Sequence, residues 1–520
     1  MVHWADVIAG KLAEQGDKHV IATGITPSGP IHVGNMREVL TADLIVRACE
    51  EQGLDAELVY IKDNADPLRK VYPFLESDEF EQHVGRALAE IPSPDGSGNY
   101  ADYFLQPFFD SLDELGVDFR VVDVFQSYKD GCYTDCVKTS IENRDQIKEI
   151  LETTSGRPLA DDWFPYNPTD DEGRQHGLKV THCEWPWVEW VSEDGREGRT
   201  NIERGNGKLP WRLDWAARWN WIGVTFEAYG KDHSAAGGSW DTGVKLSPLY
   251  GSPPPMGMMY EWIYLKGKGA MASSTGVAMS GRDLLNITPP EIMRYLVSRV
   301  KPEKHIDFDP GEGLISLADE LERLETKYHR ELKGLPRLSI GEGTRAEQQA
   351  LDDARRFELA QVSRSGTTSD SSLGVSFKHL SLLCQVRADD DDVLSSLARS
   401  HEIETADPRL TERIGRMRNW IASEWFPETA KIRLVEAIDW EALDDEQAAI
   451  VKSLGEALQD CEWEAEAVKH RVSAVISDSE MKPRDAFQSF YTALLGKSRG
   501  PALAPLLAEY ERDRVTSLFS

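Results

Sequence analysis

The chain of 520 residues lacks several features that would narrow its class at once. It has only six cysteines, which are scattered, so a disulfide framework is excluded and a reducing compartment is indicated. No apolar run is long enough to span a membrane, and the N-terminal segment has helical spacing with interleaved charges, unlike a signal peptide. We therefore expect a cytoplasmic protein of two to four domains with no membrane partner.

Basic residues are scarce. Lys and Arg number 58 against 89 Asp and Glu, which gives a formal net charge of −31 and a pI of about 4.8. Nucleic-acid binders usually carry a basic face, so this balance disfavours such a binder at low salt. Concentrated salt screens both self-repulsion and phosphate attraction, and the acids are spread along the whole chain. The composition favours a halophilic, haloarchaeal cytoplasm; an acidic face shaped for another partner is the alternative.

The N-terminal region lacks the two common phosphate-binding motifs. An apolar run at 20–22 is followed by a turn of Gly, Thr, Pro and Ser, and a helical pattern begins near Gly34. Strand, glycine-rich turn and helix form an arrangement that binds phosphates, because N–H groups at the helix start attract anions. Neither G-x-G-x-x-G nor Gly-Lys-Ser/Thr is present, and His32 and Asn35 stand at the turn instead. Imidazole and amide donors there suit a site that grips a triphosphate during bond exchange.

This turn, read as His32-Val33-Gly34-Asn35, resembles the His-Ile-Gly-His signature of class I aminoacyl-tRNA synthetases. Its lead-in at 24–29 is similar to the class I lysyl-tRNA synthetase family, found mostly in archaea, and the resemblance covers essentially the full length. An ordinary strand–loop–helix crossover is the alternative for the turn alone. The resemblance implies ATP and Mg²⁺, with lysine and tRNA(Lys) as partners and no DNA.

The order of patterns indicates four regions. Residues 1–265 are predicted to form a doubly wound, parallel-sheet, Rossmann-like α/β catalytic domain with an insertion at about 78–210. Within it, residues 155–212 are expected to be irregular. Residues 266–340 are expected to hold a second signature loop and connecting helices, and 341–374 a polar linker-like segment. Amphipathic helices without strand signals fill 375–520, an all-α region that the resemblance assigns to anticodon binding.

Two further segments resemble signatures of the family. One contains Asp232, which in class I synthetases typically holds the ribose hydroxyls of ATP through carboxylate-to-diol hydrogen bonds. The other, at 266–276, resembles the Lys-Met-Ser-Lys-Ser loop, but Ala270 and Thr275 stand where lysines are expected. A mobile lysine there normally neutralises the leaving pyrophosphate, so we predict that Lys268 replaces it.

The resemblance yields three sets of predicted site residues. The catalytic set is His32, Asn35, Lys268, Ser273 and Ser274. The ATP-binding set is Gly24, Pro27, Gly34, Asp232 and Met271. The lysine-binding set is Thr26, Trp219, His233 and Tyr260. No metal site is predicted, because the only zinc candidates in the insertion are His176, His182 and Cys183, without a Cys-x-x-Cys pair.

The predicted activity is attachment of lysine to tRNA(Lys) through lysyl-adenylate. Two alternatives remain open. A class I synthetase for another amino acid, glutamate being the nearest, would need a cation in its pocket where a lysine pocket needs an anion. A synthetase-like tRNA-binding protein without catalysis would account for the missing signature lysines.

Overall fold

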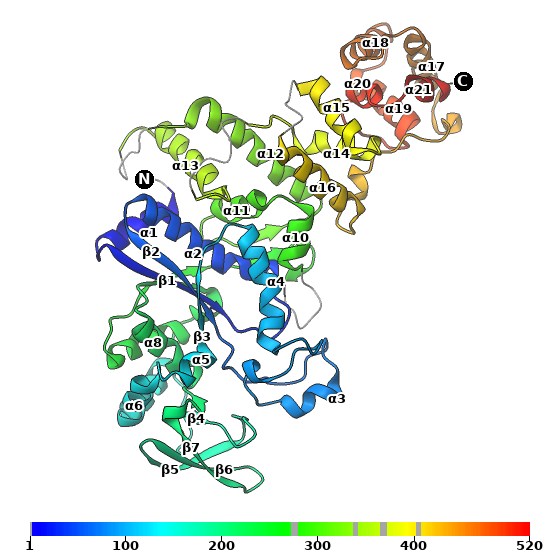
Figure 1. The fold of residues 1–520 in the computed structure, drawn as a ribbon. Coiled ribbons are helices and arrows are strands. Elements are labelled where there is room, and N and C mark those ends of the chain that lie inside the picture. The colour runs from blue at the N-terminus through cyan, green and yellow to red at the C-terminus, as the bar shows by residue number, and fades with distance from the viewer. Residues whose placement is uncertain (1–2, 272–278, 336–341, 365–371, 402–406, 520) are drawn as a thin grey trace. The chain divides into compact units, whose positions relative to one another are not determined.

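The structure is a computed structural model that describes residues 3–271, 279–335, 342–364, 372–401 and 407–519. It divides into two compact units (Figure 1), which are described separately. Unit 1 comprises Met1–Leu285, Pro290–Phe308 and Lys327–Asp370, and unit 2 comprises Asn286–Pro289, Asp309–Thr326 and Ser371–Ser520. Among the described residues, no helix combines the length and the apolar character needed to cross a bilayer.

Unit 1 is built on a five-stranded parallel sheet with the strand order β10-β9-β1-β2-β3. Its strands are β1 (Lys18–Ile25), β2 (Asp55–Lys62), β3 (Arg120–Asp123), β9 (Phe226–Gly230) and β10 (Met256–Tyr260). β1 pairs along its whole length with β2 and, on its other side, with β9. The strand order therefore reverses at β1, and such a reversal opens a crevice at the carboxyl ends of the strands. The predicted doubly wound fold is confirmed.

Helices connect these strands. α2 (Val33–Glu51) links β1 to β2, α4 (Tyr100–Glu114) precedes β3, α8 (Trp211–Ile222) precedes β9, and α9 (Ser239–Leu246) links β9 to β10. The central strands carry fully buried apolar residues, as a parallel sheet covered on both faces requires. The start of α2 consequently points at the carboxyl edge of the sheet, where the chain leaves β1.

The insertion differs from the prediction in its bounds and content. β3 joins the main sheet, so the segment expected at 78–210 is interrupted by a strand of the catalytic domain. The segment read as irregular holds an antiparallel sheet, whose short strands are half exposed and give weak sequence signals. The insertion contains α3 (Ser77–Phe80), α5 (Val124–Lys129), α6 (Thr134–Glu142), α7 (Arg144–Ser155), β5 (Leu178–Glu184), β6 (Trp187–Ser192), β7 (Glu197–Asn201), and the ribbon of β4 (Asn167–Pro168) and β8 (Gly207–Lys208).

The segment expected to be a linker at 341–374 holds a helix, α13 (Arg345–Ala360), which packs into unit 1. Arg355 of α13 pairs with Asp6 of α1 (Trp4–Ala13) at 2.9 Å, and both side chains are buried. The polar composition of this segment concealed the helical spacing of its apolar residues. The other elements of unit 1 are β11 (Ile263–Leu265), β12 (Gly269–Ala270), β13 (Ile306–Phe308), α11 (Pro290–Ser298) and the start of α10 (Gly281–Ile287).

Unit 2 is helical, which confirms the prediction for the C-terminal region. Its helices are α12 (Glu312–Lys327), α14 (Phe377–Val386), α15 (Asp390–His401), α16 (Pro408–Ala422), α17 (Asp445–Gln459), α18 (Ala465–Ser477), α19 (Pro483–Leu495), α20 (Leu503–Ala508) and α21 (Arg512–Ser517). The densest acidic run of the chain, at 389–392, forms the start of α15, where the helix dipole favours negative charge.

Candidate active site

A cleft of about 560 Å³ lies at the carboxyl ends of β1, β2, β9 and β10. Its walls come from these strand ends, from the start of α2 and from the loop after β9. The predicted site residues that line it are Gly24, Thr26, His32, Gly34, Asn35, Asp232, His233, Tyr260 and Met271. Segments far apart in the sequence are therefore brought to one site.

The start of α2 places His32 on the cleft wall. The main-chain N–H of His32 donates to Oδ1 of Asn35 at 3.2 Å, which closes the turn. A Cβ added to Gly34 would lie 2.9 Å from both Cε1 and Nδ1 of His32, so glycine lets the ring lie on the helix start. Nδ1 of His32 is buried without a hydrogen-bond partner among the described residues. Burial lowers the pKa of this imidazole and favours its neutral form.

Glu38, one turn further along α2, is a cleft residue that sequence reasoning missed. Its Oε1 accepts hydrogen bonds from the hydroxyl of Thr23 at 2.9 Å and the N–H of Gly24 at 2.8 Å. Its Oε2 accepts from the hydroxyl of Tyr260 at 2.7 Å. Within the described part of the chain, no basic side chain pairs with Glu38, and burial raises its pKa. The cleft thus holds a carboxylate whose protein partners are all neutral donors.

A second missed carboxylate, Glu227, lies on β9 and is 6% exposed. Its Oε2 accepts hydrogen bonds from the indole N–H groups of Trp215, at 3.0 Å, and Trp219. Burial raises the pKa of Glu227 to about 7. Both oxygens of Glu38 have partners, whereas both hydrogen bonds given for Glu227 within the described residues are made to Oε2, and Glu227 lines the cleft.

Trp219 was predicted to form a wall of the lysine pocket, but the structure places it behind the cleft wall. Trp219 is 1% exposed, lies against Gly243 and does not line the cleft. Trp215 and Trp211, about one and two turns earlier on α8, line it instead. The imidazole of His233 completes this aromatic wall, with ring centroids 5.9 Å from Trp211 and 5.2 Å from Trp215. Helical spacing indicated a tryptophan face but not which of its members reaches the cleft.

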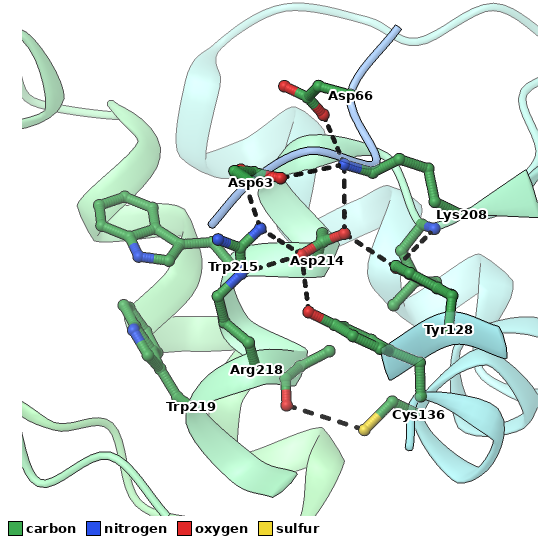
Figure 2. A network of polar contacts seen from close by, with 12 residues as sticks. Asp63, Asp66, Tyr128, Cys136, Lys208, Asp214, Trp215, Arg218 and Trp219 are labelled. Atoms are coloured by element: carbon green, nitrogen blue, oxygen red, sulfur yellow. Dashed lines mark hydrogen bonds and ion pairs between the residues drawn. The ribbon is translucent and has the colours of Figure 1, made fainter. Parts of the chain in front are cut away.

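Asp63 and Asp66 directly follow β2 and also line the cleft. Both are held by buried cations, as Figure 2 shows. Nη2 of Arg218 lies 3.1 Å from Oδ2 of Asp63, and Nζ of Lys208 lies 2.5 Å from Oδ1 of Asp66. Asp214 receives a hydrogen bond from Nε of Arg218 at 2.9 Å. Their position after a predicted strand could have marked Asp63 and Asp66 as cleft residues.

The lining is acidic overall. Its carboxylates are Glu38, Asp63, Asp66, Glu227 and Asp232, and its Lys or Arg residues are Arg69 and Arg218. Arg218 is already engaged by Asp63 and Asp214, and Arg69 is 71% exposed. An acidic cleft with low-dielectric walls concentrates cations, so the site suits a positively charged ligand.

Several predicted residues lie outside the cleft or outside the described residues. Lys268 is exposed in the turn between β11 and β12 and does not line the cleft, although Met271 does. Pro27 is buried and does not line it either, and its contact with ATP stays a prediction. Ser273, Ser274 and Thr275 lie outside the described residues. The role of Lys268 in catalysis stays a prediction.

The zinc candidates of the insertion do not form a cluster. His176 and His182 are exposed, and Cys183 is half-buried on β5. In the ranges that the structure describes, no three His, Cys, Asp or Glu side chains are placed to hold a metal ion.

Comparison with known proteins decides the family. A family model described as "tRNA synthetases class I (K)" matches residues 2–362, and one described as "Anticodon binding domain" matches residues 399–517. The chain belongs to the class I lysyl-tRNA synthetase family.

Curated relatives match this chain over essentially its full length. The "Lysine--tRNA ligase" of Methanosarcina barkeri is 40% identical, with 100% of this chain and 97% of the relative covered. That of Thermoplasma acidophilum is 37% identical over 98% and 97%, and that of Methanocaldococcus jannaschii is 38% identical over 100% and 99%. The predicted family is confirmed, and a synthetase for another amino acid is not favoured.

Proposed function

We propose that the cleft of unit 1 catalyses ATP-dependent attachment of lysine to tRNA(Lys). The carboxylate of lysine attacks the α-phosphorus of ATP, which forms lysyl-adenylate and releases pyrophosphate. The terminal 2′-hydroxyl of the tRNA then attacks the carbonyl carbon of the adenylate, which releases AMP. Membership in the family and full-length similarity to relatives named lysine–tRNA ligases support both steps.

The start of α2 supports the first step. The helix N-terminus attracts phosphate groups, and the imidazole of His32 and the amide of Asn35 border the same part of the cleft. We assign to His32 a hydrogen bond that strengthens as charge builds up on the phosphorus centre, because its buried ring nitrogen has no protein partner among the described residues. Asp232, exposed after β9, is the candidate for the ribose hydroxyls.

The observation that carries the choice of lysine is the surplus of carboxylates in the cleft. Glu38 is held by neutral donors only, and Glu227 by indole N–H groups. Lysine brings two ammonium groups, so a carboxylate with no protein cation finds its partner in the substrate. A glutamate pocket needs a cation that the substrate side chain can reach, and the guanidinium of Arg218 is already neutralised by Asp63 and Asp214.

Cofactor and environment follow from general chemistry. We infer that Mg²⁺ enters with the phosphates of ATP, because this ion keeps several waters and is usually held by substrate phosphates and one or two carboxylates. The net charge of −31 supports a further proposal, that the enzyme works in a salt-rich cytoplasm. We propose that unit 2 binds the anticodon, which the match of residues 399–517 to an anticodon-binding family model supports.

Lysine-dependent exchange of pyrophosphate into ATP tests the proposal. Glu38→Gln keeps the shape of the side chain and removes its charge, so the KM for lysine should rise by roughly tenfold or more while the KM for ATP changes little. Glu57→Gln, an exposed substitution on the same sheet, is the control. Exchange that depends on glutamate and not on lysine would point to the other synthetase, and tRNA binding without any exchange to the non-catalytic protein.

A further inference from the structure

Lys208 lies between the catalytic cleft and a second cavity of unit 1. A second cavity of about 380 Å³ lies beside the insertion, and Lys208 lines it. The ammonium of the same side chain contacts Asp66 and Asp63, which line the catalytic cleft. Figure 2 shows Lys208 reaching Asp66, Asp63 and Asp214 from one side, with Arg218 on the other. The insertion thus supplies a charge to the wall of the catalytic cleft.

The ribbon of β4 and β8 fixes the backbone of Lys208. Gly207 has a φ of +132°, and a Cβ there would lie 2.4 Å from the carbonyl oxygen of Asn167 on β4. The main-chain N–H of Leu209 donates to the hydroxyl of Tyr128 at 3.0 Å, and that hydroxyl donates to Asp214 at 2.8 Å. The backbone of Lys208 is therefore held by β4 on one side and, through Tyr128, by Asp214 on the other.

The buried positive and negative charges of this cluster do not balance. Three carboxylates, those of Asp63, Asp66 and Asp214, face two buried cations, Lys208 and Arg218, and each of the five residues is less than a tenth exposed. A third cation, the exposed Arg69, lies 3.8 Å from Asp66. Nζ of Lys208 lies 2.5 Å from Asp66, 3.4 Å from Asp214 and 3.7 Å from Asp63. Burial lowers the pKa of Lys208, but attraction to the three carboxylates outweighs it and raises the pKa well above its usual value. Lys208 is charged.

Loss of this charge would leave Arg218 as the one buried cation of the cluster facing three buried carboxylates, with Arg69 at the exposed side of Asp66. Burial raises the pKa of Asp63, and attraction to Arg218 and Lys208 opposes that shift. Removal of a neighbouring cation raises carboxyl pKa values further, so a carboxyl of the cluster would take up a proton. Because Asp63 and Asp66 line the cleft, a carboxyl protonated there would no longer offer a charged acceptor to an ammonium group of a ligand.

We propose that Lys208 is a positioning residue for lysine binding: it holds the carboxylates of Asp63 and Asp66 at the cleft as partners for an ammonium group of the substrate. This inference rests on the proposed function. It makes substrate affinity depend on a residue of the insertion that does not itself line the cleft. The alternative hypothesis is that Lys208 only stabilises the packing of the insertion against the catalytic sheet.

Lys208→Met, Lys208→Arg and Lys129→Met of the full chain test this. Lys129 is the matched control, because it lines the same second cavity and bonds Asn206 at 3.0 Å but contacts neither cleft acid. In lysine-dependent pyrophosphate exchange, Lys208→Met should raise the KM for lysine about tenfold, with kcat and the KM for ATP within about threefold. Lys208→Arg should recover part of the loss, and Lys129→Met should match wild type.

The pH dependence of the KM for lysine distinguishes the positioning role of Lys208 from a purely structural role. In Lys208→Met the cluster carboxyls hold their protons more tightly, so the KM for lysine should fall as the pH rises from about 6 to about 8.5. The wild-type KM should fall much less. In Lys208→Ala the second cavity offers a route to the vacated space, so added ethylammonium should lower the KM for lysine in that variant and not in wild type.

Each outcome is decisive. An unchanged KM for lysine in folded Lys208→Met overturns the inference, as does an equal loss in kcat and in both KM values with no pH dependence. If Lys208→Met does not fold, the Lys208→Arg values decide: a raised KM for lysine alone supports positioning, and wild-type values overturn it. Absence of lysine-dependent exchange in the wild type would instead refute the proposed function itself.

Discussion

Replacing Gly34 with alanine should separate activity from stability. A Cβ at this position would lie 2.9 Å from Cε1 and Nδ1 of His32, whereas carbon atoms in contact normally lie about 3.5–4.0 Å apart. The helix backbone is fixed by its hydrogen bonds, so the imidazole must move by roughly 0.6 Å or more. The next nearest atom, Cε of Met271, is already at ordinary contact distance at 3.6 Å. The displacement therefore falls on the predicted catalytic group.

The two expected effects have opposite signs. Gly34 is in a helix, where alanine is favoured over glycine by up to about 1 kcal/mol, so the free energy of unfolding should be unchanged or higher. A misplacement of about 1 Å in a catalytic constellation can lower the rate by about 10²-fold, so lysine-dependent exchange should fall by about 10- to 100-fold. His32→Ala sets the scale, with an expected loss of roughly 10²–10³-fold.

Gly10→Ala is the matched control. Gly10 is in the middle of α1, and the nearest atom to an added Cβ, Oε1 of Gln52, is 3.9 Å away. This variant should gain about 0.5–1 kcal/mol in stability and keep wild-type exchange. Wild-type exchange in Gly34→Ala would refute the role given to the His32 ring, and a loss of exchange with a parallel loss of stability would refute the geometric argument.

Four more predictions concern charge. Lys268→Ala should slow adenylate formation in single turnovers more than it weakens ATP binding, and an unchanged rate would remove Lys268 from the catalytic set. Thermal stability should rise as KCl increases from 0.1 M, where the Debye length is about 10 Å, towards molar levels; full stability in dilute buffer would exclude halophilic adaptation. Arg294→Met should lower the free energy of unfolding, measured by denaturant titration, by about 3–5 kcal/mol. The reason is that the fully buried Asp43 loses a partner 2.7 Å away. A change below about 1 kcal/mol would contradict this. Glu227→Gln should stabilise the protein at pH 8 by on the order of 2–3 kcal/mol and hardly at pH 4–5. The reason is that the raised pKa of the buried carboxyl makes its ionisation unfavourable above pH 7. An equal gain in stability at both pH values would contradict the raised pKa.

The parts of the fold that followed from sequence share strong local signals. The first strand, the glycine-rich turn and the start of α2 were predictable, because their residues act on their own neighbours. The helical spacing after 375 likewise needed no partner. The antiparallel sheet of the insertion and helix α13 escaped prediction because their apolar residues are few and lie among charged ones.

The cleft was only partly predictable for a different reason. Glu38 and Glu227 read as ordinary members of a helix and a strand, and their importance appears only when distant segments meet around them. Lys208 lies in a stretch read as irregular, 142 positions from Asp66. Trp219 was chosen from a set of tryptophans that share a helix. No local pattern separates the member that faces the cleft from the one behind it.

The place of β1 in the sheet has a consequence for synthesis on the ribosome. β1 pairs with β2 soon after it emerges, but its other edge pairs with β9, and Thr225 lies 205 positions after its partner Val20. That edge stays without its strand while the whole insertion is translated, at roughly 5–20 residues per second. An open strand edge is a template for pairing with other chains. The nascent chain is therefore exposed to aggregation for on the order of ten seconds or more before the catalytic sheet can close.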